Sequence, residues 1–377
     1  MVQILKEDSY FCSSEICVHN IYHNICINDK YLNVRFLFTD VFQTGIWSKL
    51  NDINDQGLKD LANGLPGIAL QSRGKGTVHN YTSAFIKWRN WAALYPEVSS
   101  FPADPMYIAL YLTHLANNAK THAPITMAFY ALSWAHKTAG LQDPTEHSLP
   151  KMVRDSSVRE LGKGKNKKLP LLPTDIMSLV VKFGKSTSSL FEFRSLCMCI
   201  LGYAGFFRYD ELSKIRRCDI EFYENYIRIF VEKSKTDVCK VGKWVYISKT
   251  YSLTCPVTVL KQYLNRAFIP DNSVKFVFRA MSYFRSVGCH RLRSGDNSLS
   301  YTTVREFMLS AFEQIGLDKT KFGTHSLRAG GATAAANNEV PDRLFKKHGR
   351  WLSEKAKDGY VVEDLKQILS VSANLGL

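Results

Sequence analysis

The sequence predicts a mainly α-helical protein with a small β-sheet, in which an all-α domain is followed by an α+β domain. Apolar residues recur at helical spacing through residues 72–161. Two short stretches, 226–231 and 243–247, alternate apolar and polar side chains and are rich in β-branched and aromatic residues. Between these regions lies a run of glycines and lysines that ends in a proline, which is typical of a linker.

Composition restricts the classes of protein to consider. A chain of 377 residues with 45% hydrophobic content can bury the cores of two domains, and this content argues against wholesale disorder. The formal charge of +15 favours an anionic partner such as nucleic acid, although a merely basic protein would carry the same charge. The nine cysteines have no framework spacing and no secretory signal precedes them, so we expect reduced thiols in an intracellular protein. The longest apolar run, residues 195–207, is too short to cross a bilayer, and no membrane role is predicted.

Residues 1–70 are expected to form an irregular, poorly defined N-terminal extension. Three cysteines and two histidines crowd together in it: Cys12, Cys17, His19, His23 and Cys26. Their spacing matches no standard zinc pattern, so unpaired thiols are favoured over a metal site.

Residues 71–161 are predicted to form a small helical domain. The first helix starts near Ser72 and carries one apolar stripe: Tyr81, Phe85, Trp88 and Tyr95. A second helix starts at Pro105, a third covers about 124–140, and a weaker fourth covers about 150–161. The helical spacing favours a packed core for these aromatic residues over a set of stacking platforms for bases.

Residues 162–172 are predicted to be a basic linker. Its lysines are candidates for contacts with a DNA backbone: Lys163, Lys165, Lys167 and Lys168. A plain solvated linker is the alternative. A second domain, residues 173–377, then starts with a helix capped in the sequence Pro173-Thr174-Asp175.

In this second domain a buried helix is followed by Arg208 and, three residues later, Glu211, which can hold the arginine in place. The two alternating stretches predict a β-hairpin with Lys235 in its turn. Residues 276–278 are expected to form a further short strand, 282–300 a loop and 302–315 a helix. Gly330 and Gly331 weaken the next helix by about 1 kcal/mol each, so a close packing contact is expected there.

The stretch around which the prediction of function is built is residues 323–333. His325 and Arg328 are three residues apart and would lie on one side of a helix. A base next to a cation suits a centre that is anionic and exchanges protons, such as a phosphate. Tyr360 is the single tyrosine after Arg328 and so the single candidate for a C-terminal tyrosine nucleophile.

Taken together, these residues resemble the tyrosine recombinases, the phage-integrase family. The resemblance rests on Arg208-x-x-Glu211, Lys235, His325-x-x-Arg328, Trp351 and Tyr360, with the family's nine-residue step between the last two. It covers about residues 72–377 and implies a helical core-binding (SAM-like) domain followed by the DNA breaking–rejoining catalytic domain. Three motifs are most similar to those in recombinases of eukaryotic mobile elements of Crypton and DIRS type: Ser-Lys-Thr-Asp at 234–237, Gly-Thr-His-Ser-Leu-Arg-Ala-Gly-Gly-Ala-Thr at 323–333 and His-Gly-Arg-Trp at 348–351.

The resemblance implies a role for each residue. Tyr360 would attack the scissile phosphate and leave a 3′-phosphotyrosyl link with a free 5′-hydroxyl. Arg208 and Arg328 would bind the non-bridging oxygens. Lys235 would protonate the 5′-oxygen leaving group, which a lysine can do when its surroundings lower its pKa.

Three further residues would support the reaction. A phenol is mostly protonated at neutral pH, so His325 would act as the base. Trp351 would donate its indole N–H to a phosphate oxygen, and Glu211 would orient the first arginine. Many members carry histidine where Trp351 stands; the spacing to Tyr360 favours the tryptophan and leaves His348 a structural or phosphate-contacting part.

The resemblance further implies double-stranded DNA as partner, a synaptic tetramer, no metal and no nucleotide cofactor. The apolar pattern after Tyr360 (Val361, Leu365, Ile368 and Leu369) would pack on its own domain or dock onto a neighbouring protomer. The nucleus is the expected compartment. A type IB topoisomerase uses the same chemistry but typically carries lysine where His325 stands. A domesticated or inactive derivative that only binds DNA remains the alternative.

Overall fold

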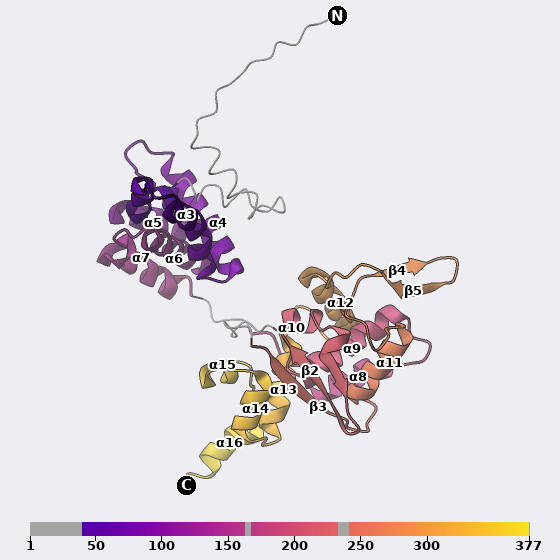
Figure 1. Cartoon of the computed structure of the whole chain (residues 1–377). Helices are drawn as coiled ribbons and strands as arrows, with labels where there is room; N and C mark the ends of the chain where they lie inside the picture. Colours follow the sequence, from indigo (N-terminus) through magenta and orange to yellow (C-terminus); the bar gives the residue numbers. More distant parts are fainter. Residues whose placement is uncertain (1–39, 163–166, 233–240, 377) are drawn as a thin grey trace, which may run out of the picture. The chain divides into compact units, whose positions relative to one another are not determined.

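The computed structural model describes residues 40–162, 167–232 and 241–376. The chain divides into two compact units, Met1–Lys165 and Asn166–Leu377 (Figure 1). The cluster of cysteines and histidines near the N-terminus lies outside the described residues, and so do Lys163, Lys165 and Lys235.

The first unit is all α-helical where it is described. Its elements are η1 (Val41–Gln43), η2 (Gly45–Asp52), α3 (Gln56–Gln71), α4 (Lys75–Ala92), α5 (Pro105–Asn118), α6 (Ala123–Thr138), η3 (Pro144–Glu146) and α7 (Ser148–Glu160). Phe85 and Trp88 of the predicted apolar stripe are fully buried and pack with Leu112 and Leu132 of the next helices. The indole N–H of Trp88 donates to the carbonyl of Ser100 at 2.8 Å, which satisfies its one polar atom. Phe85 and Trp88 are therefore core residues, as their spacing indicates, whereas Tyr95 lies beyond the end of α4 and is 40% exposed.

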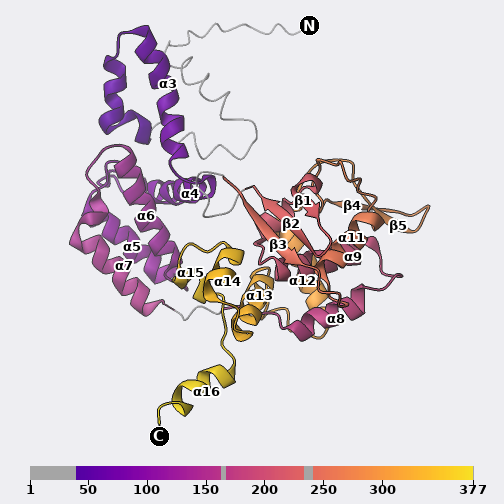
Figure 2. The ribbon, with the colours of Figure 1, turned by 60° about the horizontal axis from the view of Figure 1, so that its bottom comes forward.

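Helices lie where irregular structure is expected, since η1, η2 and α3 all begin within residues 1–70. Residues 56–71 form α3, which Figure 2 shows extending from the rest of its unit. Asp55 caps it by accepting a hydrogen bond from the backbone N–H of Leu58 at 2.9 Å. Three glycines and Pro66 lie within the helix, and their low helix propensity led to the wrong prediction for this segment.

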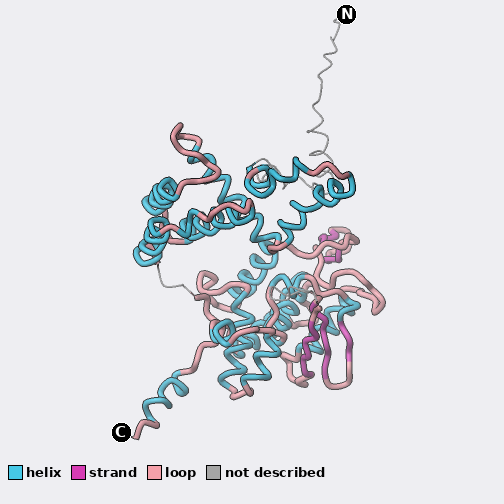
Figure 3. Tube along the Cα trace, turned by 60° about the vertical axis from the view of Figure 1, so that its left-hand side comes forward, coloured by secondary structure: helices cyan, strands magenta, loops and turns pink. Residues whose placement is uncertain are grey.

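The second unit is a helical body with a small sheet. Its helices are α8 (Pro173–Phe183), α9 (Leu190–Ala204), α10 (Tyr209–Ser213), η4 (Arg217–Asp219), α11 (Pro256–Arg266), α12 (Tyr301–Gln314), α13 (His325–Asn337), α14 (Asp342–Gly349), α15 (Glu354–Asp358) and α16 (Leu365–Ala373). Its sheet is β1 (Ile220–Phe222), β2 (Tyr226–Val231) and β3 (Lys243–Ser248), antiparallel in that order (Figure 3). The predicted hairpin is thus confirmed as β2–β3. The buried helix α9 packs against α8, α11, α12 and α13 and is the centre of the unit.

The second β-structure differs from the prediction. Within the expected strand 276–278, pairing is limited to an isolated bridge between Phe276 and Arg216. The ordered hairpin is β4 (Met281–Phe284) with β5 (Cys289–Leu292), most of which falls in the expected loop. Each strand is four residues long and includes serine or arginine, so no apolar alternation marks it in the sequence.

Gly330 and Gly331 let α13 approach its neighbours closely. A Cβ atom at Gly330 would lie 2.2 Å from the carbonyl oxygen of Leu171, and one at Gly331 would lie 2.2 Å from that of Tyr203. The packing reason expected for these glycines is therefore confirmed. The close approach brings the start of α13 to the C-terminal end of α9, where the chain leads into Arg208.

Candidate active site

Arg208 and Glu211 lie together just after α9. The Arg208 guanidinium donates from Nη1 to Glu211 Oε1 at 2.7 Å, and the Arg208 backbone N–H donates to Glu211 Oε2 at 2.9 Å. The Glu211 side chain is buried, with 2% of it exposed, whereas 15% of the Arg208 side chain reaches the surface. The Glu211 carboxylate therefore fixes both the backbone and the guanidinium of Arg208.

Arg328, on the first turn of α13, is completely buried. Its two terminal nitrogens donate to the carbonyls of Phe206 and Gly349. The rings of Trp351 and Tyr360 lie over the guanidinium, with their centroids 4.5 and 5.1 Å from its carbon. The structure thus brings both arginines, the tryptophan and the tyrosine of the predicted site to one place.

Tyr360 is half-buried and follows the short helix α15. Its hydroxyl lies 3.5 Å from Nδ1 of His325, the first residue of α13. The hydroxyl of Thr333 donates to the Tyr360 carbonyl at 3.4 Å and accepts from the Val362 N–H at 3.1 Å. These contacts hold Tyr360 beside the other site residues of its own chain.

Trp351 is 5% exposed and packs against Phe206 and Phe345. Its indole Nε1 is buried, and no hydrogen-bond partner for it occurs within residues 40–162, 167–232 and 241–376. A buried donor without a partner is costly and suits a group that a ligand satisfies. His348 instead donates from Nε2 to the carbonyl of Ala204 at 2.8 Å, so it caps α9.

Arg350 is a member of the cluster that the sequence analysis missed. It is 3% exposed, and its Nη2 lies 2.7 Å from Glu211 Oε2. The sequence offered one signal, the place of this arginine in the motif His348-Gly349-Arg350-Trp351. Nothing in residue spacing indicates that an arginine there turns inward to a carboxylate far away in the chain.

The electrostatics of the cluster favour an anion. Three guanidinium groups, those of Arg208, Arg328 and Arg350, lie within 3.9 Å of one carboxylate, an excess of two positive charges. Burial tends to raise the pKa of Glu211, but the charges of Arg350, Arg208 and Arg328 together with the Arg208 N–H lower it overall. Burial, followed by the charges of Arg208 and Arg350, lowers the pKa of Arg328 to about 9, still well above neutral pH. An anion placed here would relieve this repulsion.

The described part of the linker does not reach this cluster through hydrogen bonds. Lys167 and Lys168 are exposed, and the ammonium of Lys168 donates to the carbonyl of Thr320. The backbone N–H of Leu171 donates to the carbonyl of Ser326 at 3.1 Å, so the end of the linker lies against the first turn of α13.

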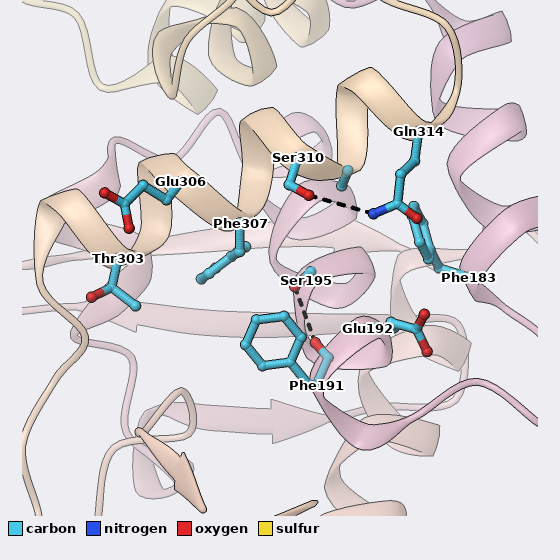
Figure 4. A pocket seen from close by; sticks show the side chains of 10 residues that line it. Phe183, Phe191, Glu192, Ser195, Thr303, Glu306, Phe307, Ser310 and Gln314 are labelled. Atoms are coloured by element: carbon cyan, nitrogen blue, oxygen red, sulfur yellow. Dashed lines mark hydrogen bonds between the residues drawn. The ribbon is translucent and has the colours of Figure 1, made fainter. Parts of the chain in front are cut away.

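Other candidate sites lie apart from these residues. A cavity of about 310 Å³ between α9 and α12 is lined partly by Glu192 and Glu306, and Figure 4 shows both carboxylates beside it. The carboxylates of Glu192 and Glu306 do not suit a phosphate, and none of the predicted site residues line this cavity.

Among the described residues, no group of three or more potential ligands could hold a metal ion. No helix of that part of the chain is long and apolar enough to cross a membrane.

Comparison with known proteins agrees with this geometry. The family model described as "Phage integrase family" matches residues 175–363, about half of the chain. An integrase/recombinase XerD homologue from Selenomonas ruminantium is 28% identical over 295 residues, which are 77% of this chain and 82% of the relative.

Solved structures share the fold. The XerH site-specific recombinase bound to a palindromic difH substrate has a TM-score of 0.59 at 14% identity, covering 92% of this chain and 95% of the other. The Tn1549 transposon integrase with transposon right end DNA has a TM-score of 0.52 at 13% identity, covering 80% and 93%. A λ integrase dimer on a COC′ core site has a TM-score of 0.51 at 16% identity, covering 78% and 91%. The chain therefore belongs to the phage integrase family of tyrosine site-specific recombinases.

Proposed function

We propose that the chain cuts and rejoins double-stranded DNA through a covalent bond between Tyr360 and the 3′-phosphate, which releases a free 5′-hydroxyl. One observation carries this proposal. Tyr360 contacts Arg328 and Trp351 through its ring and approaches His325 through its hydroxyl. A nucleophile, a base and phosphate-binding groups are thus gathered around a single point.

Arg208 and Arg328 neutralise the negative charge that builds up on the non-bridging oxygens of the scissile phosphate. Guanidinium groups fixed in a buried site stabilise such charge without having to reorganise. The excess of positive charge around Glu211 supports this role. The buried Nε1 of Trp351 gains a partner when a phosphate oxygen binds.

Proton transfer is divided between two residues. His325 takes the proton of Tyr360 during attack and returns it during religation. Lys235, whose position lies outside the described residues, protonates the 5′-oxygen that leaves. The phosphotyrosyl bond retains the energy of the phosphodiester, so the scheme calls for no metal ion and no nucleotide.

One observation favours the second candidate, a derivative that binds DNA without cutting it. Arg328 is fully buried beneath two rings, and its terminal nitrogens are engaged by two carbonyls. In this arrangement Arg328 presents no exposed atom to a phosphate, which suits a derivative that binds DNA without cutting it.

The partners follow from the same reaction. Two duplexes must be held together for strand exchange, and we propose a synaptic tetramer on DNA. A λ integrase tetramer bound to a Holliday junction is among the structural neighbours. The face of α16 bears exposed Leu365, Ile368 and Leu369, which would dock onto a neighbouring protomer.

The wording of the motifs supports a mobile-element recombinase of Crypton or DIRS type, and on that ground the nucleus was the expected compartment. The curated relative comes from a bacterium and lends the nucleus no support.

The proposal is tested with the full chain and a library of nicked duplexes whose core sequence is randomised. A nick next to the scissile position lets the 5′-hydroxyl fragment diffuse away, so the covalent adduct accumulates. Adducts are recovered under denaturing conditions and sequenced, with Tyr360→Phe as the matched control. Wild type should yield adducts that map to one sequence, and the released strand should accept a 5′ label from polynucleotide kinase.

Two outcomes would contradict the proposal. If wild type binds duplexes of one sequence but forms no adduct, the binding-only derivative is the correct assignment. If Tyr360→Phe still forms the adduct, another residue is the nucleophile.

A further inference from the structure

Arg350 occupies a backbone conformation that arginine rarely adopts. It ends α14 with φ 58° and ψ 36°, in the left-handed region. An L side chain is disfavoured there, whereas glycine is accommodated without penalty. The side chain of Arg350 is nevertheless buried, with 3% exposed, so its contacts must offset the backbone strain.

The contacts of Arg350 cap the end of α9. Its Nη1 donates to the carbonyl of Gly205 at 3.1 Å, and its Nη2 donates to that of Phe206 at 2.9 Å. His348, two residues earlier, donates to the carbonyl of Ala204. Three successive carbonyls at a helix C-terminus are thus satisfied from one segment, and a cation there is favoured by the helix dipole. The chain that leads into Arg208 is fixed by these bonds.

The same guanidinium neutralises Glu211. One carboxylate oxygen, Oε1, serves Arg208, while Oε2 accepts from the Arg208 N–H and from Arg350 Nη2 at 2.7 Å. A third cation, Arg328, has its Nη1 3.9 Å from Oε2. Without Arg350 a buried carboxylate oxygen would lose its guanidinium partner and would draw Arg328 toward itself.

We propose that Arg350 is a positioning residue for the strand-transfer reaction. It satisfies Glu211 and the end of α9, and it thereby leaves Arg208 and Arg328 aligned for the scissile phosphate without touching that phosphate itself. This inference rests on the proposed function, which assigns the phosphate to those two arginines.

The first test separates binding from cleavage. Arg350→Gly suits the left-handed backbone, so the variant should fold, and a thermal unfolding curve checks this. On the nicked duplex selected by wild type, affinity should stay within about twofold, while the single-turnover cleavage rate falls about 100-fold, the size expected for misaligned reacting groups. Arg350→Lys should recover part of the rate, because it restores a cation near Glu211.

The second test asks whether the cleavage deficit of Arg350→Gly depends on the negative charge of the scissile phosphate. A methylphosphonate at the scissile position carries no charge and needs less help from Arg208. The deficit of Arg350→Gly should therefore shrink on this substrate, as that of Arg208→Ala should. The double variant Arg350→Gly/Arg208→Ala should cleave the natural phosphate more slowly than Arg208→Ala alone, because Arg328 is still misaligned, but by less than the product of the two single deficits.

Arg194→Met is the matched control. Arg194 is also a buried arginine that donates to a backbone carbonyl, that of Arg279, but it does not contact Glu211. Its substitution should slow cleavage of both substrates equally or not at all. Equal deficits of Arg350→Gly on phosphate and methylphosphonate, or a rate like that of wild type, would overturn the inference. Failure of wild type itself to form an adduct would instead overturn the proposed function.

Discussion

The hydroxyl of Thr333 joins α13 to the backbone of Tyr360. This hydroxyl donates to the carbonyl of Tyr360 at 3.4 Å and accepts from the backbone N–H of Val362, two residues later, at 3.1 Å. Since Arg328 lies on the same helix, α13 carries both the arginine proposed to bind the phosphate and the attachment point of the proposed nucleophile. The distance between the two is therefore controlled by one rigid element.

Replacing Thr333 with valine should loosen this attachment. Valine keeps the shape of the side chain but removes the hydroxyl, and the lost hydrogen bond costs about 1 kcal/mol, or about fivefold in the docked population of Tyr360. We expect the single-turnover cleavage rate to fall by about that factor while affinity for the uncut duplex is unchanged. Thr333→Ser, which retains the hydroxyl, should cleave like wild type. Equal rates for the valine and serine variants would show that the contact does not limit cleavage.

The parts of this site that the sequence could predict are those encoded locally. The continuous apolar run of α9, the alternation of β2 and β3, and the His325-x-x-Arg328 spacing all depend on neighbours a few residues away. The strained backbone of Arg350 and its bond to Glu211, 139 positions earlier, depend on how distant segments meet. No single-sequence pattern reports such a contact. The same limit explains why α3 and the β4–β5 hairpin were missed, since in both of them composition disagrees with the structure that tertiary context imposes.

His348 should make the second unit sensitive to acid. Burial, opposed in part by its bond to Ala204 and reinforced by the charges of Arg350 and Arg328, lowers its pKa below the ordinary value of about 6.5. The unfolded chain therefore binds a proton more readily than the folded one. The contribution to stability is complete above about pH 6.5 and is lost as pH falls through that value toward the lower pKa of the folded state.

His348→Gln retains a neutral donor for the Ala204 carbonyl and should remove this dependence. The free energy of unfolding from urea titration at pH 7.5 and pH 5.5 gives the measurement. The loss on acidification should be smaller in the variant, by up to about 1.4 kcal/mol for each pH unit below the ordinary pKa. His136→Gln provides the control: burial also lowers the pKa of His136, so this variant should reduce the acid sensitivity of the first unit and leave that of the second unit unchanged. An unchanged acid sensitivity in His348→Gln would contradict the assignment.

Lys235 is assigned as the general acid from the sequence alone, and chemistry can test it. Lys235→Ala should slow cleavage by about 100-fold or more, in the range that general acids contribute. A substrate with sulfur at the 5′-bridging position releases a thiolate, which leaves without being protonated. Cleavage of that substrate by Lys235→Ala should return to the wild-type rate, whereas Arg208→Ala should not be rescued. A variant that stays slow on the sulfur substrate would remove the lysine from this role.

The apolar face of α16 should matter for assembly rather than for binding one site. Leu365, Ile368 and Leu369 are each more than half exposed, at 69%, 55% and 54%. Covering such a face on a second protomer removes apolar surface from water, which favours association. Deleting the residues after Asp364, or introducing Ile368→Asp, should therefore weaken the pairing of two duplexes.

Energy transfer between two labelled duplexes measures this pairing, and a gel-shift titration of one duplex measures single-site binding. Ser370→Asp adds the same charge on the opposite side of α16 and serves as the control. We expect it to pair duplexes like wild type, while Ile368→Asp loses pairing but keeps single-site affinity. Because a charge buried at an interface is costly and one in water is not, the difference between the two variants reports which face is covered. Equal loss of pairing and of single-site binding in Ile368→Asp would mean that α16 packs on its own unit when DNA is bound.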